Sequence, residues 1–330
     1  MKVIIPVAGI GSKLRPHTHT QPKALVPVAG KPILNHIVDN LISLGLTEFV
    51  FVIGYLGDKI EEHIRESYPS LNADFIVQEP REGIGQAVWL TRERIKGHEV
   101  LIVLGDTIFD ADLAEVLKQP YSSVGVKKVD NPGNFGVVEL NTEGFLTKVI
   151  EKPLIPKSNL ALVGLYLIKE TDKLIEALDF NIRNNKRTLN DFHLTDGLMK
   201  IIEEGVKIKS FPVENWYDCG IKSKLLETNA IFLKRNFKNV QPQYNFENTI
   251  IIPPVIIAKG CKISNSIIGP NVSIGEETIV SNSILNDAII GSFSELKNAV
   301  LHHSLVGSDA SLKGLSQSLN IGDSTEIDFT

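Results

Sequence analysis

Short apolar runs alternate with amphipathic segments of helical spacing over the first hundred residues, and this order limits the fold more than any other feature. The expected strands are 3–7, 48–54, 73–78 and 99–104, and the expected helices are 32–44, 56–67 and 84–95. Strands separated by helices are joined by right-handed crossovers, which place the strands parallel in one sheet with helices on both faces. We therefore predict an α/β fold with a mostly parallel sheet.

The segment from 107 to 235 continues this domain with a less regular order of elements. The expected strands are 122–128, 135–140, 146–150, 161–167 and 207–213, and the expected helices are 170–178, 194–204 and 221–235. Turn sequences rich in Asn, Pro and Gly separate several of these strands. We therefore predict that the sheet is mixed.

Apolar residues recur about every six positions from Ile250 onward, often with a glycine next. The repeat is carried by Ile268, Ile274, Val280, Ile290, Leu296, Val306 and Leu312. Such a hexad is typical of a parallel β-helix, in which each short strand forms one side of a coil. The phase slips between Val280 and Ile290, and 315–319 fits poorly. We predict three parts: a domain over 1–235, a linker over 236–249 and a repeat domain over 250–330.

The composition argues against several classes of protein. The chain has 330 residues, 43% apolar content and a net charge of −5, and the negative charge argues against a nucleic-acid binder. Its two cysteines, Cys219 and Cys261, provide no disulfide framework. No signal peptide is recognised, and no run approaches the ~20 apolar residues of a spanning helix. We expect a cytoplasmic protein that binds neither nucleic acid nor membrane.

A glycine-containing loop follows the first expected strand. Gly9 and Gly11 allow the backbone to turn its N–H groups toward a ligand, and Lys13 and Lys23 bracket the same space. Backbone donors combined with cations suit a triphosphate. A dinucleotide fingerprint is excluded because Leu14 stands where its third glycine belongs, and no P-loop lysine follows.

Longer motifs resemble one family. Ala8-Gly9-x-Gly11, Leu14-Arg15-Pro16 and Pro22-Lys23-x-Leu25-x-Pro27-Val28 resemble the signature of the sugar-nucleotide pyrophosphorylases, which are sugar-1-phosphate nucleotidyltransferases. The resemblance extends from Met1 to about Arg235 and is closest to glucose-1-phosphate thymidylyltransferases and uridylyltransferases. It implies a Rossmann-like nucleotidyltransferase domain with a mixed, mostly parallel sheet. It also implies that the C-terminal hexads form a left-handed β-helix.

The resemblance assigns roles to four cations. Lys23 matches the lysine that grips the phosphates, and Lys152 matches the lysine that holds the sugar phosphate. Lys13 stands where the family normally has an arginine, and lysine lacks the bidentate fork of that residue. Arg15 also matches a family position and could share the task.

Further expected roles concern the metal, the base and the sugar. Asp106, which follows a buried strand, and Asp218 match the family's Mg²⁺ ligands, a set that Mg²⁺ accepts together with phosphate oxygens. The expected nucleotide-binding residues are Ala8, Gly9, Gly11, Gln78 and Gly83, with the Gln78 amide reading a pyrimidine edge. The expected sugar-binding residues are Gly136, Glu151, Val163 and Gly164. The glycine loop, Gln78 and Asp106 all follow strands, so we expect them to converge.

The sequence thus predicts transfer of a nucleotidyl group from a nucleoside triphosphate to a sugar 1-phosphate, with release of pyrophosphate. The favoured substrates are dTTP or UTP and glucose 1-phosphate. One alternative, suggested by Lys13, is a catalytically weak homologue that binds nucleotide or sugar nucleotide and regulates a partner. Another, suggested by the hexads and His302-His303, is a bifunctional enzyme with acyltransferase activity. A homo-oligomer is also possible.

Overall fold

The computed structural model describes residues 1–239 and 244–314, and the described chain forms two compact units. The first unit comprises 1–27 and 31–225, and the second comprises 28–30 and the chain from Leu226 onward. The last helix, α8 (Lys222–Asn239), occupies the first four residues of the predicted linker over 236–249. The poorly fitting segment 315–319 and the rest of the expected repeat domain to 330 lie outside the described residues.

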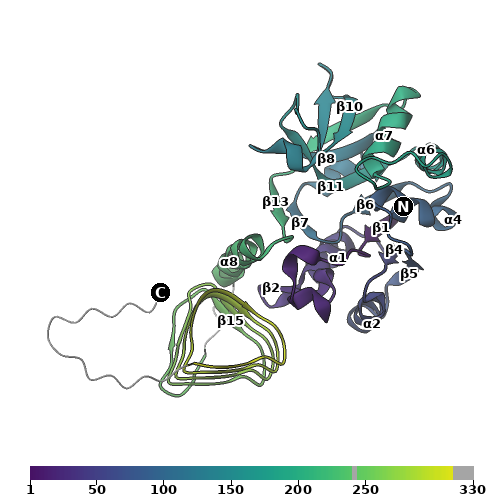
Figure 1. The fold of residues 1–330 in the computed structure, drawn as a ribbon. Coiled ribbons are helices and arrows are strands. Elements are labelled where there is room, and N and C mark those ends of the chain that lie inside the picture. The colour runs from purple at the N-terminus through teal and green to yellow at the C-terminus, as the bar shows by residue number, and fades with distance from the viewer. Residues whose placement is uncertain (240–243, 315–330) are drawn as a thin grey trace. The chain divides into compact units, whose positions relative to one another are not determined.

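The first unit contains a nine-stranded mixed sheet, and this confirms the expected α/β class (Figure 1). Its parallel part runs β6-β1-β4-β5, with bounds Val100–Val103, Lys2–Pro6, Glu48–Ile53 and Asn72–Val77. β1, β4 and β6 read as nearly continuous apolar runs because helices cover both of their faces. Each strand lies within two residues of its predicted range.

The helices of this part follow the apolar spacing of the sequence. α1 (Ile33–Ser43) buries residues three or four positions apart, and α2 (Gly57–Ser67) does the same with Ile60 and Ile64. The helix predicted over 84–95 is divided into α3 (Ile84–Leu90) and α4 (Arg92–Ile95). At the break, the buried Thr91 hydroxyl donates to the Val88 carbonyl at 2.7 Å, a local bond that competes with regular helix geometry.

The second half of the sheet is largely antiparallel. Its strands are β8 (Ser122–Lys128), β9 (Gly136–Leu140), β10 (Leu146–Glu151), β11 (Leu160–Ile168) and β12 (Ile208–Pro212). β11 pairs antiparallel with β6, β8 and β9, while β12 pairs parallel with β8. The covering helices α6 (Thr171–Arg183) and α7 (Leu194–Glu203) were both expected, although α6 extends five residues beyond its predicted end.

Several short elements were not predicted. They are β2 (Pro27–Val28), β3 (Lys31–Pro32), β7 (Thr107–Asp110), α5 (Leu113–Leu117), β13 (Asn215–Asp218) and the 3-10 helices 12–14, 17–19, 23–25 and 132–134. β7 and β13 pair with one another as a separate antiparallel ribbon. This ribbon positions one of the candidate site residues.

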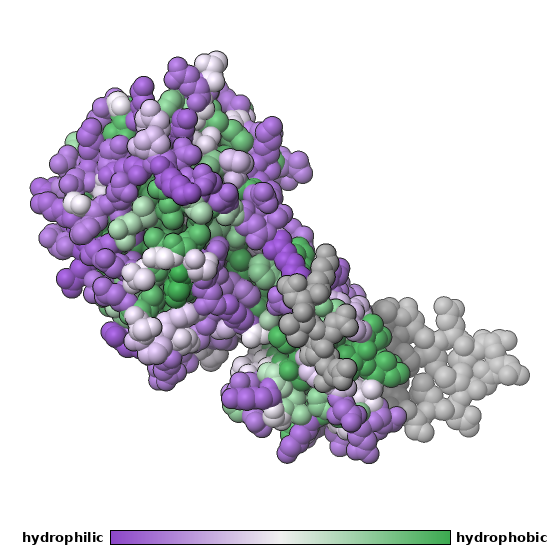
Figure 2. Space-filling model, turned by 180° about the vertical axis from the view of Figure 1, so that it is seen from behind, coloured by the Kyte–Doolittle hydropathy of each residue, from purple (hydrophilic) through white to green (hydrophobic). Residues whose placement is uncertain are grey.

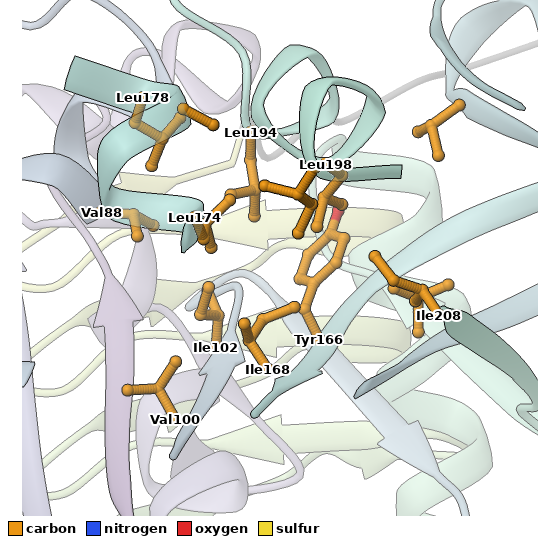
Figure 3. Close-up of a cluster of buried hydrophobic side chains, with 14 of the residues drawn as sticks. Val88, Val100, Ile102, Tyr166, Ile168, Leu174, Leu178, Leu194, Leu198 and Ile208 are labelled. Atoms are coloured by element: carbon orange, nitrogen blue, oxygen red, sulfur yellow. The ribbon is translucent and has the colours of Figure 1, made fainter. Parts of the chain in front are cut away.

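A hydrophobic core lies between α6, α7 and the sheet. Figure 3 shows Leu174 of α6 and Leu198 of α7 directed at the sheet that carries Tyr166. Both leucines are fully buried, and each such side chain contributes about 1.5–3 kcal/mol to folding. This core fixes β11, which carries the expected sugar-binding residues Val163 and Gly164, and it also fixes α7.

The second unit contains α8 from Leu226 onward and short parallel strands that stack in successive turns (Figure 1). The strands are β14 (Ile250–Ile251), β15 (Val255–Ile257), β16 (Lys262–Ser264), β17 (Ile267–Ile268), β18 (Val272–Ile274), β19 (Ile279–Ser281), β20 (Ile284–Ile290), β21 (Glu295–Lys297), β22 (Val300–Val306) and β23 (Ser311–Lys313). Ile250 pairs with Ile267 and Glu295 pairs with Ser311, so a turn takes 17 residues at first and 16 later. Three hexads would take 18 residues, so each turn is one or two residues short, and this shortfall accounts for the phase slip of the hexads.

The face of the first unit that Figure 2 shows is mainly polar, with an apolar area in its middle. Among the described residues, no helix has both the length and the apolar character needed to cross a membrane.

Candidate active site

A cavity of about 260 Å³ opens at the carboxyl ends of the parallel strands in the first unit. Its lining comprises Pro6, Val7, Ala8, Gly9, Lys23, Ala24, Gln78, Arg81, Gly83, Ile84, Ala87, Leu104, Gly105 and Asp106. The glycine loop, Gln78 and Asp106 therefore meet in one cavity, as their positions after three strands predicted. The convergence follows from parallel pairing, which brings the ends of β1, β5 and β6 to one edge of the sheet.

The glycine loop is folded back on itself beside this cavity. Gly11 has φ +63°, and a Cβ there would lie 2.9 Å from the Thr18 side chain. The Thr18 hydroxyl donates to the Gly11 carbonyl at 2.8 Å, which closes the loop. Gly9 has open space where a side chain would project, so its backbone can approach a ligand closely.

The cations of this loop differ in their placement. Lys23 lines the cavity, whereas Lys13 and Arg15 are exposed and lie outside its lining. Within the described parts of the chain, neither Lys13 nor Arg15 has an ion-pair partner. The structure thus brings Lys23, but not the other two loop cations, into direct contact with the cavity.

Lys23 and Asp106 form an ion pair at the cavity wall. The Lys23 ammonium lies 2.6 Å from Asp106 Oδ2, and Asp106 Oδ1 accepts a hydrogen bond from the Thr107 hydroxyl at 3.2 Å. Burial raises the pKa of Asp106, but the charge and hydrogen bond of Lys23 outweigh it and hold the pKa below its usual value. Asp106 is therefore ionised at neutral pH.

Asp218 reaches the same place through the β7–β13 ribbon. Asp218 pairs with Thr107, which directly follows Asp106, and the Cys219 amide donates to the Asp106 carbonyl. Asp218 Oδ1 accepts from the Gly220 amide at 2.8 Å. A Cβ on Gly220 would lie 3.5 Å from the Lys23 ammonium, so this turn closely approaches the ion pair. The two distant segments that carry these carboxylates are thereby adjacent, although Asp218 itself is not in the cavity lining.

Gln78 is buried, and backbone groups fix the orientation of its amide. The Glu82 amide donates to Gln86 Oε1 at 3.0 Å, which identifies that atom as an acceptor. Gln78 Nε2 donates to Gln86 Oε1 at 2.7 Å and to the Gly83 carbonyl at 2.9 Å. Both N–H bonds of Gln78 are thus used within the protein. Its Oε1 is the group left to accept a hydrogen bond from a ligand.

Gly83 holds the loop that follows Gln78. Its φ is +103°, and a Cβ would lie 2.5 Å from the Phe192 carbonyl oxygen. The Gly85 amide donates to the same carbonyl at 2.7 Å, and the Phe192 amide donates to the Glu82 carbonyl at 2.8 Å. Only glycine fits this position, because a side chain would meet both strain and overlap.

Glu151 is the centre of a second group of polar residues. Its Oε2 accepts from the Thr195 hydroxyl at 3.1 Å, and its Oε1 lies 3.7 Å from His193 Nδ1 and 3.8 Å from the Lys152 ammonium. A Cβ on Gly136 would lie 3.3 Å from Oε2, so Gly136 leaves room beside the carboxylate. Burial, followed by the Glu151 charge, raises the pKa of the neighbouring Tyr166 and keeps it neutral.

The remaining predicted sugar-side residues occupy a bulge in β11. Gly164 has φ +85°, and a Cβ there would overlap the side chain of Leu104, which lines the cavity. Val163 is 1% exposed and packs in the core. The sugar-side residues Gly136, Glu151, Lys152, Val163 and Gly164 are not in the cavity lining, so the structure does not bring them into one pocket with the glycine loop.

Three site residues were missed by the sequence reasoning. Arg81 lines the cavity as a second cation, and His193 and Thr195 contact Glu151. Arg81 lies in a loop directly after an expected strand, a position that could have suggested it. His193 and Thr195 border the start of α7, and no local signal connects them to Glu151, more than forty residues away.

Comparisons with known proteins agree with the features of this cavity. Residues 2–235 match the family described as Nucleotidyl transferase, and the chain belongs to this family. It is 36% identical over 265 residues to the bifunctional protein GlmU of Methanocaldococcus jannaschii, an alignment that covers 79% of this chain and 61% of that protein. It is also 26% identical over 275 residues to the glucose-1-phosphate thymidylyltransferase of Streptomyces antibioticus, covering 81% of this chain and 75% of that enzyme.

Solved structures share the fold. A putative glucose-1-phosphate thymidylyltransferase from Bacillus anthracis matches with a TM-score of 0.61 and 28% identity, over 70% of this chain and 94% of that chain. A UDP-glucose pyrophosphorylase complexed with UDP-glucose matches with a TM-score of 0.62 and 23% identity, over 71% of this chain and 98% of that chain. The second likeness establishes the fold alone.

Proposed function

We propose that this chain transfers a nucleotidyl group from a nucleoside triphosphate to a sugar 1-phosphate and releases pyrophosphate. The observation that carries the proposal is the single cavity in which the glycine loop, the Lys23–Asp106 pair and Gln78 meet. Backbone N–H groups and Lys23 suit the phosphates, and the amide of Gln78 suits the edge of a base. In-line attack by the sugar phosphate oxygen on the α-phosphorus needs no covalent protein intermediate, so positioning and charge neutralisation suffice.

The Glu151 group supports the second substrate. A partly buried carboxylate with a hydroxyl and an imidazole beside it can accept hydrogen bonds from sugar hydroxyls, and the adjacent Lys152 ammonium can hold the sugar phosphate. Lys13 and Arg15, exposed beside the cavity, would reach the triphosphate only as mobile side chains. Their roles therefore depend on the ligand drawing them in.

The fixed orientation of Gln78 suits a base that presents a hydrogen-bond donor, as thymine and uracil do. Its Oε1 can accept a hydrogen bond from the N3–H group of thymine or uracil. The other bases also carry N–H donors, so this bond alone does not select the base. The names of the relatives from Streptomyces antibioticus and Bacillus anthracis agree with a thymidylyl group and with glucose 1-phosphate as the acceptor. We propose these as the preferred substrates.

The two carboxylates fit a magnesium ion. Asp106 is ionised, Asp218 is its neighbour through the β7–β13 ribbon, and Mg²⁺ prefers one or two carboxylates completed by phosphate oxygens. The ion would supply Lewis-acid stabilisation of charge on the phosphates. The chain's own contribution is to hold both carboxylates beside Lys23.

The test is pyrophosphate release with Mg²⁺ across a grid of nucleoside triphosphates and sugar 1-phosphates. We expect the strongest signal with dTTP or UTP and glucose 1-phosphate. Gln78→Met removes the acceptor together with the N–H donors to Gln86 and Gly83 but keeps the length of the side chain, and it should reduce kcat/KM for dTTP by at least tenfold. Silence across the grid from a folded sample that still binds nucleotide would contradict the proposal. A Lys13→Arg variant that then restores turnover would favour the regulatory homologue.

A second activity is supported by the names of the relatives. The methanogen relatives are called bifunctional, and the chain spans 61% of the length of the first of them. We propose that the stacked strands form a left-handed β-helix and that an acyltransferase activity is the candidate for a second function. Release of CoA from acetyl-CoA in the presence of aminosugar phosphates tests this activity, and no release would exclude it.

A further inference from the structure

We propose that Asp287, His302 and His303 of the second unit bind a divalent transition-metal ion such as Zn²⁺. Their ligand atoms all lie within 4.8 Å of one another. Among the described residues these three form the one cluster of at least three His, Cys, Asp or Glu side chains with such spacing. They lie on adjacent turns, because β20 and β22 pair in parallel with Asn286 opposite His302.

The two imidazoles lie on the same side of their strand because of the backbone at His303. Successive side chains of a strand normally point to opposite faces. His303 has φ +48°, and this left-handed corner brings its ring to within 4.2 Å of the His302 ring, measured between centroids. Asn271 and Asp287 occupy the same corner of earlier turns, with φ +61° and +45°. The corners therefore stack, and each turn presents one side chain there.

Neighbouring amides orient two of the three ligands. The His302 Nδ1 lies 2.8 Å from Asn286 Oδ1, which can only accept, so His302 carries its proton on Nδ1 and has a free lone pair on Nε2. Asn271 Nδ2 donates to Asp287 Oδ1 at 2.7 Å, which leaves Oδ2 for another partner. Hydrogen bonds of this kind, behind the ligands, are a regular feature of metal sites because they fix tautomer and orientation.

The remaining distance suits an ion between the ligands. His303 Nδ1 and Asp287 Oδ2 are 4.0 Å apart, too far for a hydrogen bond. Two ligands with bonds of about 2.0–2.1 Å to one zinc ion lie about 3.3 Å apart at a tetrahedral angle and up to about 4.1 Å apart when opposed. Small rotations of these partly exposed side chains would complete the site. Water would fill the fourth position.

The ligand types separate this site from the pair Asp106 and Asp218. Imidazole suits zinc, copper or nickel, whereas carboxylates alone suit magnesium. An ion at the cluster would join the turn of β20 to the turn of β22. Binding should therefore stabilise the last turns of the stacked-strand unit without changing nucleotidyl transfer.

The test is calorimetric titration of the untagged full-length protein with ZnCl₂ in millimolar Mg²⁺, so that the carboxylates of the first unit are occupied. We expect one Zn²⁺ per chain and a rise in melting temperature. Asp287→Asn keeps the left-handed corner and the bond from Asn271 but removes the charged ligand, and His303→Asn also suits that corner. Each should weaken binding by at least tenfold, and Asn286→Ala should weaken it by about tenfold through the orientation of His302.

Asp309→Asn is the matched control, since Asp309 is an exposed aspartate at another left-handed corner, with φ +55°, of the same unit. It should bind Zn²⁺ as the parent does, and so should Asp106→Asn. Unchanged metal-free melting temperatures would show that the variants fold. No Zn²⁺ binding by the parent, or equal binding by Asp287→Asn and His303→Asn, would overturn the proposal. A Co²⁺ spectrum with thiolate bands would also overturn it, by indicating cysteine ligation.

Discussion

The ammonium of Lys23 lies 2.6 Å from Asp106 Oδ2 and joins two segments that are 83 residues apart. Lys23 comes from the loop after β1, and Asp106 follows β6, which pairs directly with β1. The pair therefore places a positive and a negative charge at one edge of the sheet. A triphosphate would attract the lysine and a cation would attract the carboxylate, so binding of both proposed ligands would exchange the partners of this ion pair.

Asp106→Asn should reduce nucleotidyl transfer by at least a hundredfold and should lower the melting temperature at pH 7. The pKa of Asp106 is held below its usual value, so its ionisation stabilises the folded chain above the unfolded pKa of about 3.9. This stability is lost as pH falls through the lowered folded pKa. The difference in melting temperature between parent and variant should therefore shrink below pH 4.

The measurement is thermal unfolding at several pH values between 3 and 7, with Asp130→Asn, an exposed aspartate, as the control. A difference that stayed constant over this range would show that the ion pair contributes no pH-dependent stability.

Gly83→Ala should destabilise the chain by about 2–4 kcal/mol and abolish triphosphate binding. The new Cβ would lie 2.5 Å from the Phe192 carbonyl oxygen, and φ +103° is strained for any side chain. Gly97→Ala is the matched control because Gly97 also has a positive φ, +73°, but no atom lies within 4 Å of the added group. Gly97→Ala should lower the free energy of unfolding by about 1–2 kcal/mol, because it adds backbone strain without overlap. Chemical denaturation distinguishes the two, and equal losses would mean that the overlap is relieved by movement of the loop.

The regular part of the fold could be predicted because its signals are local. Buried runs and helical spacing placed β1, β4, β5 and β6 to within two residues, and parallel pairing then implied that Gln78 and Asp106 meet. The β7–β13 ribbon could not be predicted in this way. Its four-residue strands pair across more than one hundred residues, and no local pattern specifies such a partner. For this reason the position of Asp218 relative to Asp106 required the structure.

The same distinction applies to the second unit and to the Glu151 group. The hexads predicted short strands in repeated turns. The change from 17 to 16 residues per turn depends on the corner at Asp287, which is one residue shorter than the corner at Asn271 in the preceding turn. Likewise, α7 was predicted from its apolar face, whereas the contacts of His193 and Thr195 with Glu151 depend on packing of that helix against β10. Tertiary packing determines which residues contact Glu151, and a local sequence pattern carries no information on such contacts.

Glu151→Gln should raise the KM for the sugar 1-phosphate by about tenfold and leave the KM for the triphosphate unchanged. The amide can still accept from the Thr195 hydroxyl, but it loses the charge that faces His193 and Lys152. A hydrogen bond to a charged group contributes about 1.5–3 kcal/mol, which corresponds to a factor of ten or more. Steady-state kinetics with either substrate varied gives both constants, and Glu143→Gln, in an exposed turn, is the control. An equal rise in both KM values would show that Glu151 does not select the sugar.

Asn229→Ala should destabilise the second unit, because three segments meet at this side chain. Asn229 is 1% exposed; its Oδ1 accepts from the Ala29 amide at 2.8 Å and from the Ser273 hydroxyl at 2.7 Å. Its Nδ2 donates to the Asn271 carbonyl at 3.2 Å. Truncation leaves buried donors without an acceptor, and each unsatisfied group costs about 1–3 kcal/mol.

The expected loss is therefore about 2–4 kcal/mol for Asn229→Ala, measured by urea unfolding of the full chain. Asn236→Ala, at an exposed position of the same helix α8, tests the effect of the helix alone and should change stability by less than about 0.5 kcal/mol. Asn229→Asp should also destabilise the second unit. Its carboxylate can still accept from the Ala29 amide and the Ser273 hydroxyl, but it has no N–H group to donate to the Asn271 carbonyl. If Asn229→Ala and Asn236→Ala unfold at the same urea concentration, the buried amide does not hold α8 to the stacked strands.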